Sequence, residues 1–255
     1  MNWKAFSAML ARDAHVARRN AVTTLLQTLL QPLLFVFIFG TVMTGTSLMP
    51  PAYKTMLLPG IIALSMLMTG IMSVSMPLIM EFMTKEVEDR LLAPMEVRWI
   101  AVEKVVAGMV QSLISGGVVL LAGWLLLGGK VGLNFDHPGT FIVLAILIAL
   151  LSSSGGLTMG SSVGQTHIGL LFSMVLAPLI MFGCAYYPWS YLKSFPIMQK
   201  LVLANPLTYA SEGLRGTLAP QIPHLSLAVV ISVLAVADVV LVLFGLNRFY
   251  RKAVS

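Results

Sequence analysis

The sequence has little charge for its length. Asp, Glu, Lys and Arg make up 10% of its 255 residues, whereas hydrophobic residues make up 58%. A soluble domain is about half apolar and about a quarter charged, so too few polar side chains remain here to face water on all sides. This shortage excludes a soluble enzyme or a nucleic-acid-binding protein. It predicts an all-α integral membrane protein with lipid, and no nucleic acid, as a partner.

Residue types that build metal and catalytic sites are also scarce. The single cysteine, Cys184, excludes an intramolecular disulfide and any cysteine-cluster metal site. The four histidines (His15, His137, His167 and His224) lie far apart, without the spacing of metal ligands. No apolar run contains paired carboxylates or a Ser–His set. We therefore expect no catalytic residue, no metal site and no cofactor bound by this chain.

Long hydrophobic runs are abundant. A helix that crosses the hydrocarbon of a bilayer needs about 20 mostly apolar residues. The alternating pattern of a membrane barrel is absent, so the runs predict helices. Six transmembrane helices are expected, at Leu25–Val42, Met56–Met80, Val105–Leu127, Thr140–Ser161, Ile168–Tyr187 and Leu225–Leu246.

The distribution of basic residues predicts the orientation of these helices. With six crossings, eleven of the 16 Lys and Arg residues fall on the side of both termini and five on the other. Because cytoplasmic loops carry the excess of positive charge, both termini are expected in the cytoplasm.

One transmembrane domain is expected over residues 1–255. Its parts are an interfacial amphipathic helix at 1–22, five crossings within 23–187, an outer segment at 188–224, and the last crossing with a basic tail at 225–255. Prolines divide the outer segment into apolar pieces that are too short to cross. These pieces predict short re-entrant helices that dip into the outer leaflet or lie on it.

The inner loop after the second crossing holds the densest charge in the chain. Acidic residues precede basic ones by four positions, an arrangement that stabilises a helix, and a proline then ends it. We expect a charged helix that receives force from a soluble partner, or a solvated helix without one. Its residues are Glu81, Lys85, Glu86, Glu88, Arg90 and Pro94.

Two motifs carry a family resemblance. EFMTKE from Glu81, continued by RLLAP up to Pro94, resembles the segment after the second crossing in permeases of ABC-2 type exporters. NPLTYA from Asn205, followed by Glu212 and Arg215, resembles the outer segment before their last crossing. The order of crossings and loops matches that family along nearly the whole chain.

The resemblance implies a division of labour. Two permease chains would pair, identical or paralogous, and cytoplasmic ABC ATPase subunits would bind ATP and Mg beneath them. The charged inner helix would sit in a groove of the ATPase. This chain lacks a phosphate-binding loop, because its nearest approach, GWLLLGGK from Gly123 to Lys130, does not fit the required pattern. It would act in the bacterial inner membrane.

The expected cargo is hydrophobic or amphipathic: a drug-like molecule, a lipid-linked glycan or a lipo-oligosaccharide. Candidate residues lining its pathway are Phe35, Phe39, Met66, Met72 and Asp238. Asp238 lies within the last crossing, where a charge is costly, so it is a structural or protonated acid, a substrate contact or a proton relay. If it is a relay, the protein is instead a self-contained proton-coupled carrier, or else a membrane-embedded enzyme.

Two further groups are candidates for structural roles. Small residues recur every four positions at Ser152, Gly156, Gly160 and Gly164, which predicts a seam within the chain, a dimer interface or a moving gate. The outer gate is expected to include Asn205, Pro206, Tyr209, Glu212 and Arg215. Glu212 and Arg215 are three residues apart, so they either form a local ion pair or meet a polar headgroup of the cargo.

Overall fold

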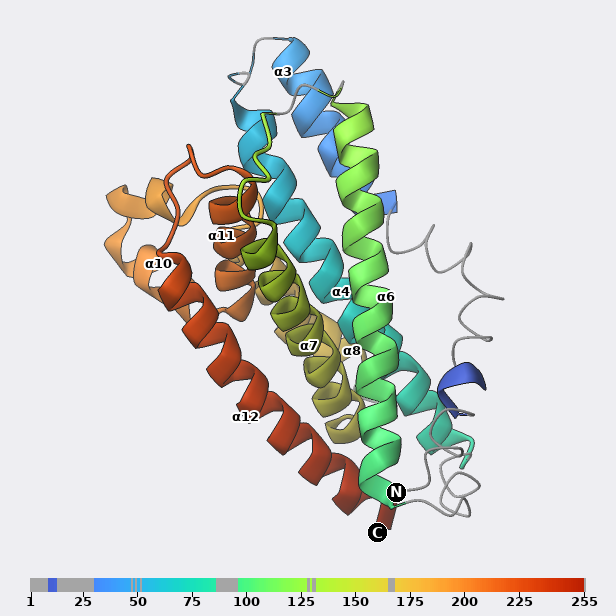
Figure 1. Cartoon of the computed structure of the whole chain (residues 1–255). Helices are drawn as coiled ribbons and strands as arrows, with labels where there is room; N and C mark the ends of the chain where they lie inside the picture. Colours follow the sequence, from blue (N-terminus) through green and yellow to red (C-terminus); the bar gives the residue numbers. More distant parts are fainter. Residues whose placement is uncertain are drawn as a thin grey trace.

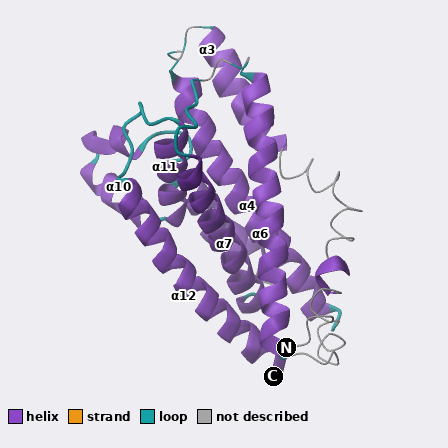
Figure 2. Ribbon diagram, in the orientation of Figure 1, coloured by secondary structure: helices purple, strands orange, loops and turns teal. Residues whose placement is uncertain are grey.

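The computed structural model describes residues 9–12, 30–46, 48, 50, 52–85, 96–127, 129, 132–164 and 168–254. Within these ranges every regular element is a helix (Figure 2). Four of them are long and apolar enough to cross a membrane, so the chain is a multi-pass membrane protein.

The long helices are α4 (Tyr53–Met83), α6 (Val97–Leu126), α7 (Pro138–Ser162) and α12 (Leu227–Val254). Before them lies a shorter apolar helix, Leu30–Gly45, which contains the π-helical segment η1 (Val36–Val42) and α3 (Met43–Gly45). Between α7 and α12 lie α8 (Ile168–Leu171), η3 (Phe172–Leu176), α9 (Ala177–Met181), η4 (Trp189–Ser194), α10 (Pro196–Leu201), η5 (Val202–Ala204) and α11 (Pro206–Leu218).

Helix α4 is the central element of the bundle. In its most apolar stretch 83% of residues are buried, compared with 17% in α12. It packs along α6 and α7, and α12 runs obliquely beside α7 (Figure 1). We call the end of the bundle that holds Met83, Val97 and Val254 the inner end, after the orientation that the basic residues predict, and the opposite end the outer end.

Four of the six expected crossings are confirmed as long apolar helices. The first is represented by Leu30–Gly45 and the fifth by α8, η3 and α9, all shorter, so a total of six stays a prediction. The expected end of the fifth helix at Tyr187 is wrong. The helix ends at Met181, where the Phe182 amide donates to the Pro178 carbonyl (2.9 Å), and the chain then turns through Cys184, which has a φ of 51°.

The outer segment forms short helices, as expected: η4, α10, η5 and α11. Helix α11 is almost wholly buried against α4, α7 and α12, whereas α10 is exposed. How deeply these helices lie in a bilayer remains a prediction. The expected interfacial helix at 1–22 lies outside the described residues, apart from 9–12.

The small residues of α7 lie against α4. A Cβ atom added at Gly156 would lie 2.7 Å from the Ile71 carbonyl oxygen, and one at Gly160 would lie 3.1 Å from backbone atoms of α4. The Ser152 hydroxyl likewise lies against the backbone of α4, where a Cβ atom added at Gly70 would clash with it. These three residues therefore let two helix backbones approach closely within one chain. Gly164 lies beyond the end of α7, with no neighbour that an added Cβ would touch.

Candidate functional site

A cavity of about 300 Å³ lies between the first apolar helix, α4 and the segment from η3 to α9. Helix α4 contributes four side chains, one on each successive turn from Ile61 to Met72. The lining residues are Gln31, Pro32, Phe35, Ile61, Leu64, Met68, Met72, Leu176, Ala177, Ile180 and Tyr186.

Among the residues that the structure describes, the lining is apolar and carries no charged side chain. Gln31 contributes an amide group and Tyr186 a phenol. The Phe35 ring packs against Tyr186 (centroids 5.0 Å apart) and stacks on Phe39 (5.5 Å), which forms an aromatic wall. A cavity of this composition solvates an apolar or aromatic molecule well and an ion poorly.

The structure brings only some of the expected pathway residues together. Phe35 and Met72 line the cavity, and Phe39 supports Phe35 from behind. Met66 lies instead on the opposite side of α4, where it is 3% exposed and packs against α6: a Cβ added at Gly116 would be 2.6 Å from its Cγ.

Asp238 also lies away from the cavity. On α12 it shares a face with Leu241 and Gly245, both of which contact Thr158 of α7. It is buried, and neither of its carboxylate oxygens has a hydrogen-bond partner among the described residues.

Two buried serines of α6, Ser112 and Ser115, form hydrogen bonds to α4 and not to Asp238. The Ser112 hydroxyl donates to the Met66 carbonyl (2.9 Å), and the Ser115 hydroxyl lies 2.6 Å from that of Ser65. Both sets of contacts join α6 to α4.

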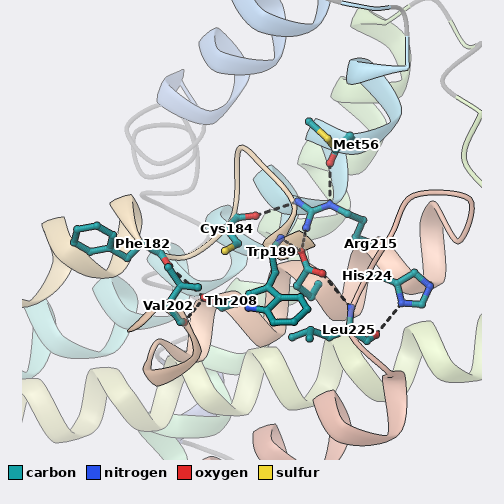
Figure 3. A network of polar contacts seen from close by, with 10 residues as sticks. Met56, Phe182, Cys184, Trp189, Val202, Thr208, Arg215, His224 and Leu225 are labelled. Atoms are coloured by element: carbon teal, nitrogen blue, oxygen red, sulfur yellow. Dashed lines mark hydrogen bonds and ion pairs between the residues drawn. The ribbon is translucent and has the colours of Figure 1, made fainter. Parts of the chain in front are cut away.

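A second feature of interest is a buried polar network at the outer end, centred on Glu212 and Arg215 of α11. Both side chains are fully buried and form an ion pair, which is the first of the two alternatives that their spacing allows. The Arg215 guanidinium also donates to the carbonyl oxygens of Met56 (3.3 Å) and Cys184 (3.0 Å) (Figure 3). It therefore joins α11 to the start of α4 and to the turn after α9.

Glu212 extends the network to two more segments. Its carboxylate accepts hydrogen bonds from the backbone amides of Trp189 (3.0 Å) and Leu225 (3.1 Å). A buried ion pair needs further hydrogen bonds to offset its desolvation, and here every guanidinium nitrogen and both carboxylate oxygens have at least one partner. Burial lowers the pKa of Arg215 from its ordinary value, and the neighbouring Glu212 carboxylate opposes that shift.

Asn205 fixes the entry to α11. Its side-chain oxygen accepts from the Leu207 amide (2.9 Å) as a helix cap, and its amide donates to the Leu179 carbonyl of α9 (2.8 Å). Pro206 occupies the first helical position, where its missing N–H costs nothing. Tyr209 is partly buried against the core. The expected gate residues thus lie in or beside one network that fastens the outer segment.

At the inner end, Glu81 belongs to α4 itself. It is buried, and its carboxylate accepts from the Lys104 ammonium of α6 at 2.8 Å. Lys85 is exposed and has a φ of 62°, so α4 does not continue through it. The expected helix residues Glu86, Glu88, Arg90 and Pro94 lie outside the described residues.

Two lysines, Lys104 and Lys252, contribute to the sequence pattern only as positive charges on the inner side, whereas the structure places both in contacts between helices. Only the position of Lys104, within a turn of an apolar run, sets it apart in the sequence.

Comparison with known proteins gives a consistent result. Residues 4–219 match the ABC-2 type transporter family. The chain is similar to the inner membrane transport permease YadH of Escherichia coli (strain K12): 26% identity over 217 residues, which covers 84% of this chain and 82% of the relative. The YadH permease of Shigella flexneri matches to the same extent. No solved structure is significantly similar to the chain.

Proposed function

Because the chain belongs to the ABC-2 type transporter family, as its membrane permease component, we propose that it forms the transmembrane pathway of an ATP-driven exporter. The permease domain lacks an ATPase site. Hydrolysis would therefore fall to separate cytoplasmic ABC ATPase subunits, which carry the ATP and Mg. The names of the relatives support a place in the bacterial inner membrane.

The observation that carries the proposed cargo is the apolar cavity beside α4. Its aromatic and methionine lining suits a hydrophobic or amphipathic molecule, such as a drug-like compound, a lipid-linked glycan or a lipo-oligosaccharide. A small ion would find no charged group there to replace its hydration shell. Asp238 lies elsewhere, so the cavity offers no carboxylate to a proton-coupled carrier.

A second permease chain, identical or paralogous, would complete the wall of the pathway. Exposed apolar side chains flank the cavity on the first apolar helix and on η3 and α9: Leu34, Ile38, Met174 and Met181. Such a surface suits contact with lipid or with another apolar chain. The family resemblance favours the second chain.

The charged inner loop would contact the ATPase. Reversing the charges of Lys85, Glu86 and Arg90 together should detach the ATPase or uncouple hydrolysis from transport, while the permease still inserts. Retention of full coupling would argue against this role.

Purification of the tagged chain in mild detergent tests whether it binds an ATPase. A protein with a phosphate-binding loop should copurify with the chain. Inverted vesicles should then take up the neutral hydrophobic dye Nile red only when ATP is present. If the chain alone, reconstituted without any ATPase, accumulates the dye against its gradient, the permease proposal is wrong.

A matched pair of variants tests the cavity. Met72→Lys places a charge in its lining and should block dye uptake without loss of the ATPase. Met80→Lys places the same charge on an exposed position of the same helix, and should leave uptake intact. Equal uptake by both variants would remove the cavity from the pathway.

A further inference from the structure

A buried ion pair joins the inner ends of α4 and α6. The Lys104 ammonium lies 2.8 Å from the Glu81 carboxylate, and the two side chains are 6% and 10% exposed. A buried pair of this kind holds its helices in one relative position, because separating two opposite charges within a desolvated site costs free energy.

A second lysine joins two other helices to the same end of α4. The Lys252 ammonium, near the end of α12, donates to the carbonyl oxygens of Gly160 (3.3 Å) and Val163 (3.2 Å) at the end of α7. The same ammonium lies 4.4 Å from the centre of the Phe82 ring of α4. Charged side chains thus hold α4, α6, α7 and α12 together as one body at the inner end.

The Glu81–Lys104 pair lies at the base of the charged inner loop. The loop leaves α4 after Met83 and enters α6 at Val97, so any displacement of the loop is applied to these two helix ends. If the ends were free to separate, such a displacement would splay them. The ion pair opposes that separation.

Helix α4 then connects this point to the cavity. Its lining residue Met72 precedes Glu81 by nine positions on the same continuous helix, a distance of about 13 Å along the axis. The first apolar helix and the η3–α9 segment form the opposite wall, and neither takes part in the Glu81 and Lys252 contacts described above. The cavity therefore lies at the boundary between the joined helices and this opposite wall.

We propose that Glu81 and Lys104 are positioning residues for transport: their ion pair makes α4 and α6 move together and carries motion of the charged loop to the cavity wall. This inference rests on the proposed function, because it requires an ATPase that moves the loop. A purely structural role would affect stability alone, whereas the proposed role affects the response of the cavity to nucleotide.

The test measures that response without knowledge of the cargo. Cys184→Ala removes the one native cysteine, and Met72→Cys then reports access to the cavity through its rate of labelling by a maleimide. The permease with its copurified ATPase is labelled in nanodiscs, with and without ATP and vanadate. In this parent the two rates should differ.

Glu81→Gln in the same background should make the two rates equal, while the ATPase still copurifies and hydrolyses ATP. The exchanged pair E81K/K104E should restore the difference. Lys200→Gln removes an exposed lysine of α10 and should behave like the parent. If Glu81→Gln does not assemble, Lys104→Gln removes the other half of the pair and gives the same comparison.

A full nucleotide-dependent difference in Glu81→Gln would overturn the inference. So would a loss that the exchanged pair fails to restore although it assembles with the ATPase. If the parent copurifies with no ATPase, or if its labelling rate is the same with and without nucleotide, the proposed function itself is contradicted.

Discussion

Arg215→Met is expected to loosen the outer segment by about 3 kcal/mol, at the lower end of the cost of breaking a buried ion pair. The variant leaves the Glu212 carboxylate buried and the carbonyls of Met56 and Cys184 without the guanidinium donor. The amides of Trp189 and Leu225 still bond Glu212, which is why the lower end of the range applies.

The protein carries its own reporter for this change. Cys184 is the one cysteine, its side chain is fully buried, and its carbonyl is one of the groups that Arg215 holds. A thiol-reactive dye can reach it only when the turn opens, so the labelling rate follows the free energy of local opening. A loss of about 3 kcal/mol raises that rate by about two orders of magnitude.

Two controls make the measurement specific. Lys200→Met removes an exposed positive charge from the same outer segment and should label at the original rate. Arg215→Lys keeps the charge but not the planar fork of donors, so it should fall between the two. If Arg215→Met labels no faster than Lys200→Met, the network does not hold the outer segment closed.

Two other substitutions have equally direct outcomes. Gly156→Val should lower the thermal unfolding temperature sharply, since the added Cβ would meet the backbone of Ile71. Gly164→Val should be tolerated, because a Cβ there has no neighbour within 4 Å. Equal effects of the two variants would contradict the seam between α7 and α4. Asp238→Asn should not lower the unfolding temperature, because the buried carboxylate has no hydrogen-bond partner among the described residues. A large fall in the unfolding temperature would mean that the ionised acid makes an essential contact.

Hydropathy specifies the long helices because a helix is the only way an isolated apolar segment satisfies its backbone in lipid. It misplaces their ends. Helix α6 begins at Val97, not at Val105, because its first turns carry Glu103 and Lys104. These charges make the segment look unlike a transmembrane helix in the sequence, yet Lys104 is buried in the structure, where it pairs with Glu81. Only the folded arrangement supplies that partner.

Composition likewise predicts which residue types line the cavity, but not which way they point. Met66 and Met72 both lie on α4 and are chemically identical, yet only Met72 faces the cavity. Apolar residues occur all around helix α4, and several of its hydroxyl side chains are buried too, so the sequence does not reveal its rotation. The spacing of Glu212 and Arg215 does predict their pairing. The four backbone groups that complete their network come from distant segments and leave no local signal.

The long helices of this bundle are longer than the membrane is thick. Helices α4 and α6, with 31 and 30 residues, each extend about 45 Å, against about 30 Å of hydrocarbon. Each helix must therefore tilt, or its ends must project into the headgroup layers. In a thinner bilayer both helices would lean further, and the walls of the cavity with them. We therefore expect the lipid chain length of the host membrane to change the tilt of α4 and α6 and the shape of the cavity.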